Sequence, residues 1–382
     1  MDCDIYSSPE HQVFRETVQK FAEDELRPRA REFEAAGRMD KSLFKRMGDL
    51  GMLGLRYDPE YGGAGLDWSF SAVMHEELAR VADCAGATLA ISVHTEMATP
   101  SLAQFGNPQL KRDFLVPAIA GETVSAIAVT EPDAGSDVAG IKTRAVRDGD
   151  DWVIDGSKIY ITNADIADWL CLLAVTDPDA GYGGYSQIIV PTNTPGVSYD
   201  LLDKIGHWGS DTGQFHFEGV RVPVSNTIGE VGRGFQQQMM QFQDERLVGC
   251  ISGLYAMEAL WEETKRWTEQ RVLFGKPLSK MQNTQFKMAG LWTRIQAAKE
   301  LERACLRRIL AGEDATTLIT AAKVFVVEVS MEVATECMQL YGGYGYMKEC
   351  PAGRAFVDTR LAAIGGGSNE TMLQYLAKQL GF

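Results

Sequence analysis

The chain has 382 residues, of which 45% are hydrophobic and 23% charged, a composition typical of a globular protein with more than one sub-domain. Its formal net charge of −15 disfavours broad binding to nucleic acid or to an anionic membrane, because attraction to phosphates requires a basic surface. A small polyanionic ligand is compatible with this charge, since a few arginines or helix N-termini can hold it.

The cysteine and histidine patterns predict neither a disulfide framework nor a metal site. The seven cysteines include no C-x-x-C pair, and the five histidines form no H-E-x-x-H cluster. The N-terminal residues MDCDIYSSPEHQ lack the apolar segment of a secretory signal, and no uncharged apolar run has the length of a membrane-spanning helix. We therefore expect a reduced intracellular location: the cytoplasm of a bacterium, or the mitochondrial matrix of a eukaryote.

Helical periodicity dominates the first part of the chain, which we assign to an N-terminal domain at residues 1–121. The segment SPEHQVFRETVQKFAEDELRPRAREFE begins with a Ser-Pro start signal and repeats apolar residues at helical spacing. The segment FSAVMHEELARVADCAGATLAISVH continues that pattern. Between them, RYDPEYGGAGLDWS contains Pro59 and three glycines, which predict a loop.

The pattern then changes to strands and back to helices. Residues 122–233 contain short β-rich runs, such as DDWVIDGSKIYITN and GQFHFEGVRVPV, which favour an antiparallel sandwich or barrel. Helical spacing returns in residues 234–382, where apolar residues recur three or four apart at Phe286, Ala289, Trp292, Ile295, Ala298 and Leu301. The predicted fold class is α+β, with a helical domain, a central antiparallel β-domain and a C-terminal helical domain.

Two motifs in the central segment carry residues that suit a planar, polar ligand. VTEPDAGSD has hydroxyls at Thr130 and Ser136 in a turn-rich loop, although an ordinary surface turn explains the same residues. KIYITNAD is typical of a strand, with Tyr160 and Thr162 on the same side. Such a pair is able to stack on a planar cofactor and hydrogen-bond to it. A half-buried strand with no binding role is the plainer interpretation of the same residues.

The C-terminal part adds motifs rich in glycine, arginine and aromatic residues. QRVLFGKPL and MQLYGGYGYMKE are examples, but the glycines of the second lack the spacing and the preceding strand of a Rossmann fingerprint. An ordinary nicotinamide enzyme is therefore disfavoured. DERLV places Glu245 next to Arg246 in a helical segment, where an internal ion pair or simple exposure is the plainer interpretation.

In this order and spacing, the motifs resemble the acyl-CoA dehydrogenase family of FAD flavoproteins, and the likeness runs essentially from end to end. The segments that carry it are VTEPDAGSD, KIYITN, DERLV, RVLFGK, QLYGGYGYM and GGGSNETM. The last three, with Glu245, look closest to the long-chain and isovaleryl-type branch. The resemblance implies a helical domain at 1–121, a β-domain at 122–233 and a four-helix bundle at 234–382. It also implies a homotetramer, built as a dimer of dimers.

The resemblance implies FAD-dependent α,β-dehydrogenation of an acyl-CoA thioester to a trans-2-enoyl-CoA, in the β-oxidation of fatty acids or in branched-chain catabolism. We assign Glu245 as the base that removes the α-proton, while the β-hydrogen passes to flavin N5 as hydride. We assign to Gly365 a backbone N–H that polarises the thioester carbonyl, at the place where many relatives carry a carboxylate. Glu370 is a weaker candidate base, because it falls at a different place in the family pattern.

The resemblance further implies residues that contact the cofactor and the substrate. Those implied for FAD are Val129, Thr130, Ser136, Tyr160, Thr162, Arg271, Phe274, Gln339, Gly343 and Asn369. Gln339 and Gly343 are expected to reach it across a dimer interface, and Ser136 and Arg246 are expected to contact substrate as well. No metal ion is expected.

Two rival functions stay open at this point. Acyl-CoA oxidases and some flavin monooxygenases share the scaffold, and they differ in the access of oxygen to reduced flavin. A non-catalytic acyl-CoA-binding flavoprotein is the other rival, suggested by the glycine at Gly365. For a dehydrogenase, electron-transferring flavoprotein is the expected acceptor. The acyl chain is open among long, methyl-branched and terpenoid-like groups, since Gly249 and Gly253 fit either a wide pocket or close helix packing.

Overall fold

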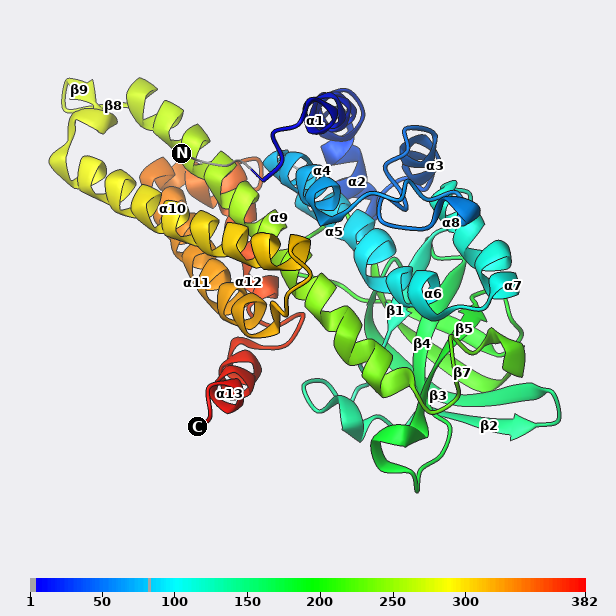
Figure 1. Ribbon diagram of the computed structural model, residues 1–382. Helices are drawn as coiled ribbons and strands as arrows, with labels where there is room; N and C mark the ends of the chain where they lie inside the picture. The colour runs from blue at the N-terminus through cyan, green and yellow to red at the C-terminus, as the bar shows by residue number, and fades with distance from the viewer. Residues whose placement is uncertain (1–4, 82–83) are drawn as a thin grey trace.

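The computed structural model of the chain describes residues 5–81 and 84–382. It contains a helical N-terminal region, a central β-sheet and a C-terminal helical bundle, in the order predicted (Figure 1). The N-terminal helices are α1 (Pro9–Phe21), α2 (Ala30–Ala36), α3 (Ser42–Asp49), α4 (Trp68–Arg80), α5 (Ala85–Ser92), α6 (Pro100–Phe105), α7 (Pro108–Leu110) and α8 (Val116–Ile119). A π-helical turn, Val93–Ala98, joins α5 to α6.

Local signals in the sequence explain where the N-terminal helices begin. Ser8 caps α1 because its Oγ accepts a hydrogen bond from the His11 N–H at 3.3 Å, and Pro9 occupies the first helical position. Asp67 caps α4 in the same way, accepting from the Ser69 N–H at 2.8 Å. The predicted loop around Pro59 is present between α3 and α4.

The central region is one seven-stranded sheet whose strand order is β1-β4-β2-β3-β7-β6, with β5 paired to the other side of β4. Its strands are β1 (Ser125–Ala128), β2 (Arg144–Asp148), β3 (Asp151–Thr162), β4 (Trp169–Val175), β5 (Tyr185–Pro191), β6 (Val197–Leu201) and β7 (Thr212–Pro223). Most pairs are antiparallel as predicted, but β1 and β2 each pair with β4 in parallel. Period-2 alternation marks strands well, but it carries no information about the direction of the neighbouring strand.

The C-terminal region consists of long helices and a short hairpin. Its elements are α9 (Gly234–Gln270), β8 (Val272–Leu273), β9 (Lys276–Pro277), α10 (Gln282–Leu310), α11 (Thr316–Tyr341), α12 (Pro351–Ala362) and α13 (Asn369–Gln379). Helices α9, α10 and α11 pack together with the shorter α12, and α13 packs against α11. Helix α9 has 37 residues and also contacts α4 and β5, so it runs from the sheet through to the far end of the bundle (Figure 1).

The apolar series predicted in α10 is buried only in its second half. The helical spacing is right, but Phe286 and Trp292 are 68% and 49% exposed. The side that packs against α9 and α11 carries Met288 and Leu291, together with Ile295 and Ala298 of the predicted series. The first turns of α10 therefore present an apolar stripe that nothing in the described chain covers, and spacing alone did not distinguish it from the core face.

Candidate active site

Glu245 lies on α9 at the level where this helix leaves the sheet and enters the bundle. Its Oε1 faces the loop between α12 and α13, because a Cβ built on Gly366 would lie 3.4 Å from that oxygen. The next residue, Arg246, donates a hydrogen bond from Nε to the Gly366 carbonyl oxygen at 3.1 Å. The structure thus brings the predicted base and its neighbouring arginine against the glycine-rich C-terminal loop.

The same loop corrects the role assigned to Gly365. The Gly365 N–H already donates to the Leu361 carbonyl at 2.8 Å, and a Cβ built on Gly365 would contact Leu361 rather than Glu245. An N–H that is used in this way is unable to polarise a substrate carbonyl. The Gly366 N–H has no acceptor within residues 5–81 and 84–382. The glycine that faces the carboxylate is therefore Gly366, one position later than predicted.

The electrostatic setting of Glu245 suits a base that works near neutral pH. Burial raises the pKa of Glu245 to about 7, against the lowering influence of Arg246 and Lys323. A carboxylate with a raised pKa binds a proton more strongly and is a better general base near that pH. The plain alternative of an ion pair with Arg246 does not hold, because the Arg246 guanidinium is directed to the loop carbonyl.

Three further residues that the sequence singles out lie on α13 and α9. Glu370 is exposed in the first turn of α13, so it points to solvent and lies apart from the position of a base. On α9, Gly253 faces α11, where an added Cβ would be 3.5 Å from Ser330 Oγ, as expected for close helix packing. Gly249, one turn after Glu245, has nothing within 4 Å of an added Cβ, so the space beside the carboxylate is open there.

The VTEPDAGSD motif forms the wall of the sheet that faces α9. Val129 is buried in a cluster with partly buried Phe235 and Phe242 of α9, which sets the motif beside the helix that carries Glu245. The Thr130 carbonyl accepts a hydrogen bond from the Ile159 N–H at 2.8 Å, so this motif and KIYITNAD are held together. Ser136 is exposed in the turn that follows.

Tyr160 has the geometry of a side chain held out for a ligand. It lies at a bulge in β3 between Lys158 and Ile161, and its φ of 61° is in the left-handed region that non-glycine residues rarely adopt. Lys158 and Ile161 are buried, whereas Tyr160 is 68% exposed and Thr162, two residues further on, is partly buried. Strain of this kind is often found where a binding site needs a particular side-chain direction. An exposed aromatic ring beside a hydroxyl fits a planar cofactor.

A buried ion pair holds these two motifs in place. Lys158 Nζ donates to Glu131 Oε1 and to the Val129 carbonyl, both at 2.8 Å, and neither side chain is more than 7% exposed. Burial alone would raise the pKa of Glu131, but Lys158 and the N–H groups of Lys142 and Thr143 lower it below its usual value. The pair therefore fixes the loop that carries Thr130 against the strand that carries Tyr160.

Replacing Lys158 with methionine is expected to destabilise the fold by about 3 kcal/mol, because it leaves the buried Glu131 carboxylate without its counter-charge. The exposed Lys142, which pairs with Asp133 across 3.4 Å, provides a matched control. Its methionine variant is expected to change stability by less than about 0.5 kcal/mol. Urea unfolding of both variants decides the matter, and equal midpoints for the two would contradict the expectation.

The remaining predicted cofactor residues lie at the other end of the bundle. Arg271 and Phe274 belong to the β8–β9 hairpin, where Phe274 is 97% exposed. Gln339 and Gly343 are near this hairpin, because Trp267 at the end of α9 stacks on Tyr341 with ring centroids 4.9 Å apart. Along α9, the 25 steps from Glu245 to Gln270 span about 38 Å at 1.5 Å per residue. Within one chain, these residues are therefore far from Glu245.

Asn369, the last predicted cofactor residue, lies instead beside the glycine loop. It opens α13, and its Oδ1 accepts a hydrogen bond from Lys323 Nζ at 3.1 Å. The structure thus divides the predicted residues into three groups: one on the sheet, one at the loop and one at the distal hairpin.

Sequence reasoning missed two sets of buried charges near the site. Lys323 projects from α11 to the glycine loop; the signal was a single lysine in the apolar run TAAKVFVV. Arg56 bonds to Glu96 and to Asp244, the residue before Glu245, and its Cζ lies 3.8 Å from the Trp68 ring centroid. No motif marked this second set, because its members are far apart in the sequence.

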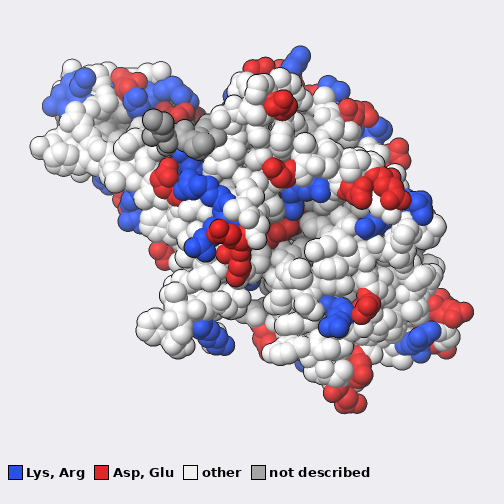
Figure 2. All heavy atoms as spheres, in the orientation of Figure 1, with Lys and Arg blue, Asp and Glu red and all other residues white. Residues whose placement is uncertain are grey.

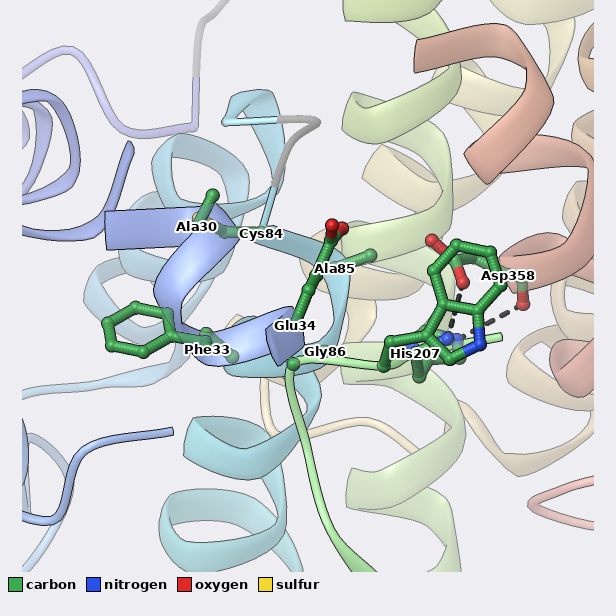
Figure 3. A pocket seen from close by; sticks show the side chains of 11 residues that line it. Ala30, Phe33, Glu34, Cys84, Ala85, Gly86, His207 and Asp358 are labelled. Atoms are coloured by element: carbon green, nitrogen blue, oxygen red, sulfur yellow. Dashed lines mark hydrogen bonds between the residues drawn. The ribbon is translucent and has the colours of Figure 1, made fainter. Parts of the chain in front are cut away.

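A small cavity elsewhere contains none of the predicted site residues. It lies where α2, α5, the loop after β6 and α12 meet, and Figure 3 shows Phe33, Glu34, Gly86 and His207 around it. The His207 N–H donates to Asp358 Oδ1 at 2.5 Å, which ties this loop to α12. We assign the cavity a packing role at the junction of the three regions.

The outer surface shown in Figure 2 has acidic and basic side chains interspersed over the same face. In the part of the chain that the structure describes, no helix has the length and apolarity needed to cross a membrane.

A helical domain, a largely antiparallel sheet and a helical bundle, joined by one long helix that bears a carboxylate, define an acyl-CoA dehydrogenase-like protein. Three family models match: "Acyl-CoA dehydrogenase, N-terminal domain" at residues 8–122, the middle domain at 126–220 and the C-terminal domain at 232–381. The chain belongs to the acyl-CoA dehydrogenase family of oxidoreductases, which confirms the family predicted from the motifs.

Named relatives and solved structures match over nearly the whole chain. The long-chain specific acyl-CoA dehydrogenase, mitochondrial, of Sus scrofa is 37% identical over 379 residues, covering 98% of this chain and 87% of that protein. The structure of butyryl-CoA dehydrogenase from Megasphaera elsdenii has a TM-score of 0.94 at 34% identity, with 100% of each chain covered. A glutaryl-CoA dehydrogenase from Mycobacterium smegmatis, in complex with FADH2, has a TM-score of 0.92 at 28% identity, covering 100% of this chain and 96% of that one.

Proposed function

We propose that this protein is an FAD-dependent acyl-CoA dehydrogenase that uses Glu245 to remove the α-proton of an acyl-CoA thioester. The observation that carries the proposal is the pairing of two groups. A carboxylate with a raised pKa faces a loop whose Gly366 N–H has no acceptor in the described chain. Removal of a proton next to a carbonyl requires a base and, close to it, a hydrogen-bond donor for the carbonyl oxygen.

The chemistry explains why both groups are needed. The α-proton of a thioester is far less acidic than a carboxylic acid, so a base with a pKa of about 7 is unable to remove it alone. A donor aimed at the thioester oxygen stabilises the enolate charge as it develops, and it does so most strongly where water is excluded. Glu245 accepts the α-proton, and the Gly366 N–H donates a hydrogen bond to the thioester carbonyl oxygen. Arg246 holds the glycine loop against α9 through its hydrogen bond to the Gly366 carbonyl.

The residues present fit FAD as the cofactor. The exposed Tyr160 and the neighbouring Thr162 suit a planar ring with polar edges, and Val129 and Thr130 form the adjoining wall. When bound, FAD supplies an acceptor for the β-hydrogen as a hydride, and the product is a trans-2-enoyl-CoA. Ser136 is positioned in the same loop for contact with cofactor or substrate.

The separation of the predicted FAD residues supports an oligomer. One chain places Arg271 and Phe274 about 38 Å along α9 from Glu245, so a single FAD reaches both groups only if the hairpin comes from a second copy. The uncovered Phe286 and Trp292 on α10 provide apolar surface for such an assembly. We therefore propose a homotetramer built as a dimer of dimers.

Several finer assignments belong to the same proposal. The domain division at 121/122 and 233/234 is supported by the change from helices to strands after α8 and by the start of α9 at Gly234. Electron-transferring flavoprotein is the proposed acceptor, and β-oxidation of long or branched acyl chains is the proposed role. The open space at Gly249 supports a wide acyl pocket. The proposed location is the bacterial cytoplasm, or the mitochondrial matrix for a eukaryotic source.

Anaerobic mixing with acyl-CoAs tests the proposal. Butyryl-, isovaleryl-, octanoyl- and palmitoyl-CoA are added to the FAD-loaded protein, and at least one is expected to bleach the yellow flavin absorbance within seconds. Air is then admitted: slow reoxidation is expected of a dehydrogenase, whereas rapid reoxidation would indicate an oxidase or a monooxygenase. A flavin that no acyl-CoA bleaches would overturn the proposal in favour of a non-catalytic binding protein.

A further inference from the structure

Lys323 is a buried lysine on α11 whose ammonium bonds to the loop that faces Glu245. Its Nζ donates to the Gly367 carbonyl at 2.5 Å and to Asn369 Oδ1 at 3.1 Å, and the residue is 4% exposed. The other buried residues of α11 around it are uncharged and mostly apolar, including Val324 and Val326. Burying an ammonium group destabilises the folded state unless the group is fully hydrogen-bonded. The presence of a lysine at this buried position therefore needs a functional or structural explanation.

The loop that Lys323 holds has little structure of its own. It contains three consecutive glycines, and Gly366 and Gly367 have φ values of 65° and 95°, a region that glycine enters without strain. The same freedom means that the backbone has many alternative conformations when nothing fixes it. Only a fixed loop can keep an N–H aimed at a substrate oxygen while the charge on that oxygen develops.

Two cations from different helices bond to successive carbonyls of this loop. Arg246 on α9 bonds to the carbonyl of Gly366, and Lys323 on α11 bonds to that of Gly367. Lys323 also donates a hydrogen bond to Asn369, the first residue of α13. One ammonium therefore connects the end of the loop to the start of the next helix. Arg246 and Lys323 thus hold the two peptide units that follow Gly366, and the bond from the Gly365 N–H to Leu361 holds the unit before Gly365. The peptide that carries the Gly366 N–H therefore lies between fixed neighbours, which restricts its rotation.

We propose that Lys323 is a positioning residue of the active site, which locks the Gly366 amide in the orientation that polarises the thioester carbonyl. This inference rests on the proposed function, because it assigns Lys323 to the same proton abstraction. Lys323 itself does not touch the reacting atoms; it acts through the Gly367 carbonyl and Asn369. Its charge also matters, since a cation bonds to a carbonyl more strongly than a neutral donor does.

The test compares Lys323→Met and Lys323→Arg with Lys299→Met in the full-length, FAD-loaded protein at pH 7. Lys299 is the matched control, because it is a half-buried lysine of the same bundle that pairs with Glu258 at 2.9 Å, away from the loop. Steady-state rates are measured with a dye as acceptor and with the acyl-CoA that bleaches the wild-type flavin fastest. Lys323→Met is expected to lower kcat by about 10- to 100-fold while KM changes less than about threefold. Lys323→Arg is expected to recover part of kcat.

A second readout measures enolate stabilisation at equilibrium, without hydride transfer. Acetoacetyl-CoA is acidic enough to form an enolate without reducing the flavin, and its enolate absorbance is titrated on the protein. Lys323→Met is expected to raise the pH midpoint of this titration by about one unit, which corresponds to tenfold weaker stabilisation of the enolate. Lys299→Met is expected to leave it unchanged.

The outcomes separate this inference from the proposed function. If the wild-type flavin is bleached by acyl-CoA but Lys323→Met matches Lys299→Met in kcat and in the enolate midpoint, the role of Lys323 is wrong and the function stands. If no acyl-CoA bleaches the wild-type flavin, the function itself fails. Should Lys323→Met not fold, Lys323→Gln takes its place with the same two readouts, and wild-type values for it would again overturn the inference.

Discussion

Replacing Glu245 with glutamine is expected to lower the rate of flavin reduction by acyl-CoA at least about 10³-fold while FAD stays bound, because the amide has no basic oxygen to accept the α-proton. The size and shape of the side chain are nearly unchanged, so the loop at Gly366 is expected to keep its position. Rapid mixing under anaerobic conditions measures the rate, and the flavin absorbance of the purified variant measures cofactor content.

Glu370→Gln is the matched control for this variant. It makes the same chemical change four residues beyond Gly366, on a side chain that is exposed in α13. Its reduction rate is expected to stay within about twofold of wild type, as is usual for a surface substitution away from the chemistry. If Glu370→Gln lost activity while Glu245→Gln kept it, the two assignments would have to be exchanged.

The pH dependence of the wild-type rate gives independent evidence on Glu245. Burial raises the pKa of Glu245 to about 7, so the carboxylate is protonated and inactive below that pH and ionised above it. Flavin reduction at low acyl-CoA concentration is therefore expected to rise about tenfold per pH unit below pH 7 and to level off above it. A rate that stays flat down to pH 5 would be the behaviour of an unperturbed carboxylate and would contradict the raised pKa.

The sequence was informative wherever periodicity or a motif marked a residue. The three regions, the helical spacing of α10, the strand that carries Tyr160 and the helical setting of Glu245 all follow from such signals. Helical spacing shows which residues of α10 share a face but not which turns of that face are covered, so it does not distinguish the exposed Phe286 from the buried Ile295. A helix face becomes core only if another element covers it, and that depends on contacts distant in sequence.

The one-residue error at the glycine loop has a comparable cause. Three consecutive glycines carry no side chains that would fix the alignment, so a motif match does not show which of them faces the carboxylate. The structure distinguishes them through backbone bonds: the Gly365 N–H closes a turn on Leu361, and the Gly366 carbonyl accepts from Arg246. The role of Lys323 could not be predicted for a related reason. Its partner, the Gly367 carbonyl, is 44 residues away in the sequence and comes close only in the folded chain.

Moving the base from α9 to the loop is expected to rescue activity. In the double variant with Glu245→Gly and Gly366→Glu, the new side chain starts at a Cβ that lies 3.4 Å from the place of the original Oε1. The bonds from Cβ to the carboxylate of a glutamate span that gap, and the removal of Glu245 leaves room for it. We expect the double variant to reduce its flavin at least about tenfold faster than Glu245→Gly alone, since proton abstraction by a positioned group contributes 10²–10⁴-fold.

The neighbouring glycine provides the matched control for this relocation. In Glu245→Gly with Gly365→Glu, the new Cβ faces Leu361, so the carboxylate starts away from the substrate and no rescue is expected. The productive double variant is expected to be less stable by about 1–2 kcal/mol, because Gly366 has a φ of 65° that a glutamate adopts only with strain. Rescue by position 365 instead of 366 would show that the loop in solution has shifted by one residue. Rescue by neither would show that the carboxylate must approach the substrate from α9.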